Sequence, residues 1–276
     1  MAENKNTSIP EIPADEIPIS QLSTVNPTES NKHNADKKET VTTQTEENVQ
    51  NKTPFSVVEA YKNIRVHLLS TLNTINGKTV VVSSPYASDG KSTTAVNIAI
   101  TISHLNKKVL LIDADSRRST IHKKLKMQNE IGCTDVILGE DELRAVVKPY
   151  NNYLDILTAG SAVSNPSELF SSSNFDILLQ KACDIYEYVI IDTPPINIVS
   201  DTLVIAQKCD GLVLVARAGI TTYEAMKSTV DAAKSLNINI IGTVLNGTDS
   251  SYNKYYRYKY NKYNKKYGKY NYYSKY

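Results

Sequence analysis

The sequence is poor in cysteine and has no long apolar segment. Its three cysteines, Cys133, Cys183 and Cys209, are far apart and form no C-x-x-C pair, which argues against a disulfide framework or a zinc site and suits a reducing compartment. No apolar run approaches the roughly 18 residues that a transmembrane helix needs. The chain opens with polar and acidic residues instead of a secretory signal, so we expect a cytoplasmic protein that reaches a membrane only through a partner.

Aliphatic residues are also scarce at both ends of the 276-residue chain. Residues 1–53 are rich in Asn, Thr, Glu, Lys, Ser and Pro without a sustained period, and we expect this N-terminal extension to be disordered. Residues 250–276 consist almost entirely of tyrosine, lysine and asparagine, and we expect a low-complexity tail that builds no core. The net charge of +2 therefore hides an acidic head and a strongly basic tail.

The middle of the chain, residues 54–249, alternates nearly continuous apolar runs with helical patterns. This alternation predicts a parallel sheet covered on both faces, that is, a doubly wound α/β domain. Strands are expected at residues 79–84, 108–113, 153–158, 188–192, 211–216 and 238–245, and helices from about residue 54 and at 91–105, 175–185 and 223–236.

One loop carries the pattern of a phosphate-binding site. Residues 85–92 (PYASDGKS) follow a predicted strand and open a predicted helix, and the final G-K-S is typical of a P-loop (Walker A). The helix N-terminus favours phosphate, Lys91 is expected to reach the β- and γ-phosphates, and Ser92 is expected to bind Mg²⁺. Pro85 replaces the first glycine of the pattern, and an ordinary helix start with Asp89 as N-cap is the structural alternative. The predicted ATP-binding residues of the loop are Ser88, Asp89, Gly90, Lys91, Ser92 and Thr93.

Three carboxylates follow two further apolar strands. Asp113 and Asp115 lie two residues apart at the end of one strand, in LLIDADSR (110–117). Asp192 ends the other, in YVIIDTPP (188–195), as expected of a Walker B strand whose carboxylate supports Mg²⁺. Ligands of open α/β sheets bind at the carboxyl ends of strands. A solvated turn and a capping aspartate are the structural alternatives, but the order of the three motifs predicts a nucleotide site on a P-loop NTPase fold.

These motifs resemble those of the bacterial tyrosine kinases, specifically the free-standing cytoplasmic kinases of capsule and exopolysaccharide synthesis in low-GC Gram-positive bacteria. The resemblance covers about residues 55–276 and includes GKSTT, IDADSRR, VIIDTPP and NPSEL (165–169). NPSEL also has the form of a helix start, with Asn165 as N-cap, Pro166 as the first helical residue and Glu168 as the third.

The resemblance implies a protein-tyrosine autokinase that uses ATP and Mg²⁺. Asp113 would accept the proton of the attacking tyrosine, Lys91 would hold the phosphates, and Ser92 and Asp115 would arrange Mg²⁺ with Asp192 nearby. Asn246 resembles the adenine-contacting Asn of related ATPases, with a plain turn Asn before Gly as the alternative. The implied phosphate acceptors are the tyrosines of the tail: Tyr252, Tyr255, Tyr256, Tyr258, Tyr260, Tyr263, Tyr267, Tyr270, Tyr272, Tyr273 and Tyr276.

The resemblance also implies partners. Glu59, Lys62 and Arg65 occupy the family's E-x-x-R-x-x-R positions, which join subunits in a ring. The middle Arg is Lys here, which keeps the charge but loses the bidentate fork, and a solvated helix face is the alternative. A membrane-anchored activator (a polysaccharide co-polymerase whose cytoplasmic tail completes the site) and a cognate tyrosine phosphatase are expected, and no nucleic acid.

Two rival functions fit parts of the sequence. A partitioning or division-site ATPase would share the fold and switch dimers without phosphorylating protein, but such proteins carry a second lysine in the loop where this chain has Tyr86. A tail of lysines interleaved with aromatic rings could instead bind nucleic acid or a membrane surface. Transfer of labelled phosphate to protein separates the kinase from both.

Overall fold

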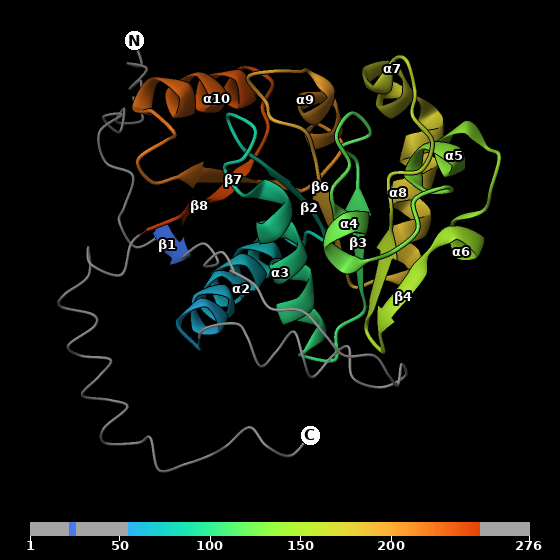
Figure 1. Cartoon of the computed structure of the whole chain (residues 1–276), viewed down its shortest axis with the longest axis horizontal. Helices are drawn as coiled ribbons and strands as arrows, with labels where there is room; N and C mark the ends of the chain where they lie inside the picture. Colours follow the sequence, from blue (N-terminus) through green and yellow to red (C-terminus); the bar gives the residue numbers. More distant parts are fainter. Residues whose placement is uncertain (1–21, 26–54, 249–276) are drawn as a thin grey trace, which may run out of the picture.

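The computed structural model of the protein describes residues 22–25 and 55–248 (Figure 1). The predictions for the tail, and for most of the N-terminal extension, lie outside these residues. The strands are β1 (Leu22–Val25), β2 (Thr79–Ser83), β3 (Val109–Asp113), β4 (Lys148–Asn151), β5 (Leu154–Leu157), β6 (Tyr188–Asp192), β7 (Gly211–Arg217) and β8 (Ile240–Asn246). The helices are α2 (Phe55–Ile75), α3 (Lys91–Ser103), α4 (Ile121–Leu125), α5 (Cys133–Leu138), α6 (Leu143–Val146), α7 (Pro166–Ser171), α8 (Ser173–Ile185), α9 (Asp201–Ala206) and α10 (Tyr223–Ser235).

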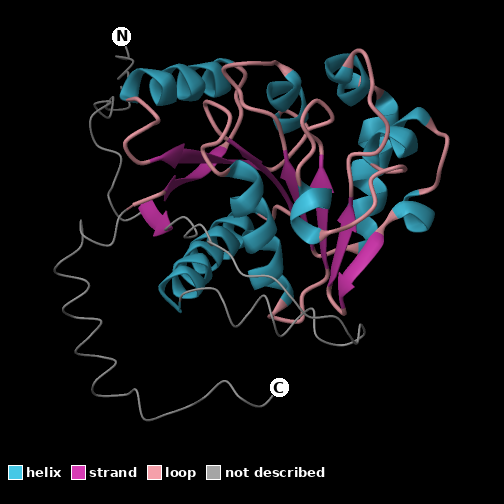
Figure 2. Ribbon diagram, viewed as in Figure 1, coloured by secondary structure: helices cyan, strands magenta, loops and turns pink. Residues whose placement is uncertain are grey.

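The strands form one sheet in the order β1-β8-β7-β2-β6-β3-β5-β4. Neighbouring strands are parallel throughout, except that the edge strand β4 is antiparallel to β5. Helices lie on both sides of the sheet (Figure 2). Helices α2 and α3 pack on one face, and α5, α8, α9 and α10 contribute to the core on the other. The predicted doubly wound α/β fold is confirmed.

The central strands are buried on both faces, which explains their continuous apolar sequences. In β2, Val80 and Val82 enter the core beneath α2 and α3, whereas Val81 enters the core beneath α8 and α9. All three side chains are fully buried. Because a β-strand alternates its side chains between faces, a strand between two helical layers needs apolar residues at every position.

The long predicted elements are confirmed with boundaries within two residues, whereas several short ones were not predicted. Helices α4, α5, α6 and α9 span four to six residues, too short to show a period. Strand β4 lacks an apolar run because it is a partly exposed edge strand. No helix in the described ranges has the length and apolarity needed to cross a membrane.

Strand β1 lies inside the extension for which we expected no regular structure. Residues 22–25 pair in parallel with β8, from Leu22 opposite Thr243 to Val25 opposite Asn246. A strand at the edge of a sheet exposes unpaired backbone N–H and C=O groups, so β8 can template a short segment that contains β-branched residues. The expectation of disorder is therefore wrong for these four residues.

The side chain of Asp210 joins the start of β2 to the turn before β7. Its Oδ2 accepts hydrogen bonds from the backbone N–H of Lys78 and of Thr79, both at 2.8 Å, and from Thr79 Oγ1 at 2.7 Å. Burial alone would raise the pKa of this carboxyl, but the three donors outweigh it, so the pKa of Asp210 is lowered.

We predict that Asp210→Ala lowers the free energy of unfolding by about 1–2 kcal/mol at pH 7, because three donors lose a charged acceptor. A lowered native pKa stabilises the fold above the pKa of the unfolded carboxyl, about 3.9, and this contribution disappears as the pH falls through the native value. Urea unfolding at pH 7 and at a pH below the native pKa of Asp210 measures this contribution. Asp231→Ala, which breaks only the exposed ion pair to Lys227 on α10, is the control. Equal losses in the two variants at pH 7 would contradict the prediction.

Candidate nucleotide-binding and catalytic site

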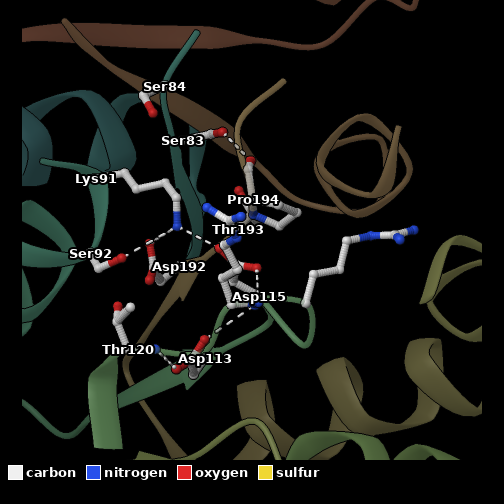
Figure 3. Close-up of polar contacts among 12 residues, drawn as sticks. Ser83, Ser84, Lys91, Ser92, Asp113, Asp115, Thr120, Asp192, Thr193 and Pro194 are labelled. Atoms are coloured by element: carbon white, nitrogen blue, oxygen red, sulfur yellow. Dashed lines mark hydrogen bonds and ion pairs between the residues drawn. The ribbon is translucent and has the colours of Figure 1, made fainter. Parts of the chain in front are cut away.

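The site lies where β2, β6 and β3, three adjacent strands, reach the same edge of the sheet. Lys91 begins α3 just after β2, while Asp113 and Asp192 are the last residues of β3 and β6 and lie opposite each other in register. The sheet order therefore brings together motifs that are up to about a hundred residues apart in sequence (Figure 3). This is the arrangement that the sequence predicted.

The loop between β2 and α3 has the backbone of a phosphate cradle. Ser88 and Gly90 have positive φ angles of 69° and 105°. Gly90 is the N-cap of α3 and no side chain caps the helix, so the first N–H groups remain available to an anion. The alternative in which Asp89 is the N-cap is wrong. Its carboxylate turns back into the loop and accepts from the N–H of Tyr86 at 3.1 Å.

Asn246, at the end of β8, supports this loop from the side. Its Nδ2 donates to the carbonyl oxygen of Asp89 at 3.0 Å. A Cβ atom added to Gly90 would lie 1.9 Å from the same nitrogen. Glycine is therefore required at position 90 by both the φ angle and the approach of Asn246. The predicted contact of Asn246 with adenine stays a prediction.

Lys91 is the buried cation of the site. Its Nζ lies 2.8 Å from Oδ2 of Asp115 and 3.7 Å from Oδ1 of Asp192, and donates to Ser92 Oγ at 3.3 Å. Burial lowers the pKa of the Lys91 ammonium, but the fields of Asp192 and Asp115 outweigh this effect, and the pKa is raised. The ammonium thus stays charged in a site that is almost closed to solvent.

Asp113 lies behind Asp115 and is fully buried. Its Oδ1 accepts from the N–H of Asp115 at 3.2 Å, and its Oδ2 accepts from the N–H groups of Thr120 and Ile121 at 3.2 and 3.1 Å. Burial, and then the charge of Asp192, raise the pKa of Asp113 to about 8. A carboxyl with a pKa near neutrality is suited to exchange a proton with a substrate.

Asp192 is the residue whose environment is incomplete. It is fully buried, and within the described residues neither of its oxygens accepts a hydrogen bond within 3.5 Å, although the Lys91 ammonium lies 3.7 Å from Oδ1 and the Ser92 hydroxyl is close enough to lower its pKa. Burial raises its pKa to about 6, against the lowering effect of Lys91. A buried carboxylate without donors is costly unless a cation completes it, and oxygen ligands from carboxylates and hydroxyls are those that Mg²⁺ prefers. Ser92, Asp115 and Asp192 therefore fit a magnesium site.

Comparison with known proteins agrees with this geometry. A family model described as AAA domain matches residues 77–239. Tyrosine-protein kinase YwqD of Bacillus subtilis is 37% identical over 190 residues, which are 68% of this chain and 80% of that protein. Tyrosine-protein kinase CpsD of Streptococcus pneumoniae is 35% identical and covers 64% of this chain and 79% of CpsD. The chain belongs to the bacterial tyrosine-protein kinases.

Solved structures of related proteins have the same fold. The kinase domain of Escherichia coli tyrosine kinase ETK superposes with a TM-score of 0.72 at 29% identity, over 83% of this chain and 90% of that domain. The chimerical protein CapA2B2 superposes with a TM-score of 0.68 at 28% identity, over 73% of this chain and 88% of the chimera. The full-length E. coli kinase etk is much longer, and the match covers 27% of it. The P-loop nucleotide-binding fold is therefore that of a protein-tyrosine kinase.

A second group of contacts ties two motifs of this kinase together. Arg117 donates from Nε to Asp201 Oδ2 at 2.7 Å, and Ser167 Oγ donates to Asp201 Oδ1. Asp201 therefore links the IDADSRR segment to NPSEL. Asn165 is the N-cap of α7 as predicted, but its side chain bonds to Glu168, at 3.4 Å, and not to the backbone.

Two cations on the P-loop of the kinase were not predicted. Lys124 of α4 donates to Thr93 Oγ1 at 2.9 Å, and Arg217, the last residue of β7, donates to the carbonyl of Ser88 at 3.0 Å. The signal for Arg217 was its place at the end of a strand, since β7 neighbours β2. The short helix that carries Lys124 has no sequence period by which to place it.

The predicted subunit-contact residues lie on α2. Lys62 forms an ion pair of 2.7 Å with Glu59 on the same helix. Arg65 turns inward and donates from Nη1 to the carbonyl oxygen of Thr101 on α3, at 2.6 Å. Arg65 thus joins the two helices within one kinase domain, and its role between subunits stays a prediction.

We predict that Gly90→Ala weakens nucleotide binding by more than tenfold, because the new methyl group displaces Asn246 and the loop. Gly139→Ala is the matched control: Gly139 also has a positive φ, 82°, but a Cβ there meets open space. Backbone strain alone costs about 1 kcal/mol of stability in each variant. Titration with a fluorescent ATP analogue, alongside urea unfolding, measures both effects. Wild-type affinity in Gly90→Ala would contradict the account of the loop.

Proposed function

We propose that this kinase transfers the γ-phosphate of Mg-ATP to tyrosines in the tail of a neighbouring copy, and thereby regulates capsule or exopolysaccharide polymerisation and export. The observation that carries the proposal is the buried Lys91 held between Asp115 and Asp192 at the start of α3. The sequence supplies the acceptor, because residues 252–276 hold eleven tyrosines and no acidic residue.

In this proposal, Lys91 exchanges the carboxylate of Asp115 for phosphate oxygens. Its ammonium is neutralised by the carboxylate of Asp115. Phosphate oxygens at the start of α3 would compete for the same Nζ and release Asp115 toward the metal. The backbone of the loop, from Ser88 and Asp89 through Gly90 to Thr93, would surround the phosphates, and Asn246 would lie beside the adenine.

Magnesium would neutralise charge on the β- and γ-phosphates during transfer. Ser92 and Asp192 would hold it directly, and Asp115 through water. The oxygens of Asp192 accept no hydrogen bond within 3.5 Å in the described residues and have only the more distant Lys91 ammonium as an ion-pair partner, so a second cation would reduce the cost of burying them. Lys91 remains the fixed positive charge of the site.

Asp113 would accept the proton of the tyrosine hydroxyl. Its raised pKa, about 8, suits this task, but both of its oxygens now face backbone N–H groups and the side chain is fully buried. The proposal therefore includes a displacement of the segment 115–121 when nucleotide and tyrosine bind. Breaking the hydrogen bonds to Thr120 and Ile121 would open one oxygen to the substrate.

The tail would act as a switch as well as a substrate. Residues 252–276 carry eight basic side chains. Each phosphate adds about −1.5 to −2 charges, so four or five phosphates cancel the positive charge. Phosphorylation in trans would thus convert a segment attracted to the anionic site into one that is repelled, loosen a ring joined through Glu59, Lys62 and Arg65, and make the reaction self-limiting. A cognate tyrosine phosphatase would reset it.

The proposed location is the cytoplasm, at the inner face of the membrane. A membrane-anchored co-polymerase would recruit the kinase and complete its site with a cytoplasmic tail, as the family resemblance implies. Residues 1–53 and 250–276 would then be flanking segments of the kinase domain, 54–249. We expect weak activity from the isolated chain.

We predict that γ-labelled ATP labels the full chain on tyrosine, and that Asp113→Asn binds nucleotide normally but transfers label at least about 100-fold more slowly, as expected for loss of a general base. Phosphotyrosine analysis and nucleotide titration measure the two properties separately. Asp231→Asn on α10, which removes an exposed carboxylate outside the proposed machinery, is the control. Release of free phosphate without labelled protein would identify the partitioning-type ATPase instead, and full transfer by Asp113→Asn would exclude its role as base.

A further inference from the structure

Helices α5, α6 and α8 lie together on one flank of the domain (Figure 1). A groove lies between α8 and the segment that joins α5 to α6. It has a volume of about 600 Å³ and shares no residue with the nucleotide site. Its floor is formed by Leu143 and Leu178, which are buried, and its wall by Ile177, whose side chain is 51% exposed. Asn174 Nδ2 donates to the carbonyl of Ile137 at 2.8 Å and fixes α8 against α5 at one end. The groove thus offers an apolar patch centred on Ile177 within a largely polar lining.

The rim of this groove is acidic. Glu140, Asp141 and Glu142 lie side by side along one edge, and within the described residues no hydrogen bond or ion pair engages their carboxylates. A second hollow of about 380 Å³ continues along α8 past Glu142 to Asp184. The two hollows together carry four carboxylates against two cations, Arg144 and Lys181, so their net charge is negative.

We propose that this groove is a docking surface for residues 252–276 of a neighbouring copy, the segment that the kinase phosphorylates. The proposal rests on the proposed function, which makes this segment the substrate. The eleven tyrosines of this segment are complementary to the apolar part of the groove, and its eight basic residues are complementary to the acidic rim. A tyrosine ring can cover Leu143 and Ile177 while its hydroxyl stays near water, and neighbouring lysines can pair with the free carboxylates of the rim.

The proposed transfer in trans assigns the groove to the tail of a neighbouring copy. The described chain ends just after β8, near one edge of the sheet, whereas α6 leads directly into β4, the opposite edge. In a head-to-tail arrangement, the end of β8 in one copy would lie near the groove of the next copy. An extended segment of this length reaches roughly 80–90 Å. One part can dock while a tyrosine from another part enters the nucleotide site.

Docking of this kind would release its own product. The rim attracts the unmodified segment through its lysines, and each added phosphate places negative charge beside Glu140 and Glu142. The groove would then hold the substrate and repel the phosphorylated tail, without any change in the nucleotide site.

The test is a titration of the full-length protein into a fluorescein-labelled synthetic peptide of residues 252–276. Glu140→Lys/Glu142→Lys should raise the dissociation constant about five- to tenfold, from the loss of two exposed charge pairs and the added repulsion. Glu224→Lys/Asp231→Lys on α10 makes the same charge change elsewhere and should bind as the wild type does. The same peptide phosphorylated on its tyrosines should bind at least tenfold more weakly to the wild type.

A charge-swapped peptide removes the ambiguity of a misfolded variant. With its eight basic residues replaced by Glu, the peptide should bind Glu140→Lys/Glu142→Lys more tightly than it binds the wild type. Equal affinity of the unmodified peptide for both double variants would overturn the proposal. The proposal would also be overturned if Glu140→Lys/Glu142→Lys bound the peptide as the wild type does but had a different molecular mass in solution. That result would assign the groove to a contact between the kinase domains of two copies. Because binding is read without ATP, failure here is separate from failure of phosphotyrosine formation, which tests the proposed function.

Discussion

The site depends on one buried ammonium group among three buried carboxylates. Lys91 Nζ lies 2.8 Å from Asp115 and 3.7 Å from Asp192, and Asp113 lies directly behind. One positive charge cannot neutralise three negative ones in a dry environment, which is why burial raises the pKa of both Asp113 and Asp192. A divalent cation beside Asp192 would offset part of this excess negative charge.

The layered fold is what allows charged residues to gather at this site. Strands β2, β6 and β3 can place charged residues at their ends because their apolar interiors are sealed by helices on both faces. The next layer of contacts is indirect: Asn246 from β8 and Arg217 from β7 hold the P-loop, and Asp201 links Arg117 to Ser167. Residues that support the site therefore come from most of the width of the sheet, although the groups proposed to react lie at the ends of three strands.

The sequence predicted the elements that have a long hydrophobic pattern and the site residues that belong to recognisable motifs. The continuous apolar sequences of strands such as β2 and β3 predicted burial on both faces of the sheet. The G-K-S and D-x-D motifs predicted that their residues lie at the carboxyl edge. Contacts between segments without such patterns could not be predicted. The hydrogen bond from Asn246 to Asp89 depends on how closely β8 approaches the loop, and the link through Asp201 depends on a six-residue helix. Strand β1 was missed because its pairing is determined by the free edge of β8, not by its own four residues.

We propose that the charge at Asp192 is held for a bound cation and not for the fold. Thermal unfolding of the wild type and of Asp192→Asn, each with and without Mg²⁺ and a non-hydrolysable ATP analogue, tests it directly. In the wild type, ligand at about 100 times its Kd should add about 2.7 kcal/mol, a rise of about 5–11 °C in Tm. Asp192→Asn should unfold at or above the wild-type Tm without ligand, and should lose the rise. A variant that unfolds well below the wild type, yet keeps the full rise with the analogue and Mg²⁺, would contradict the account.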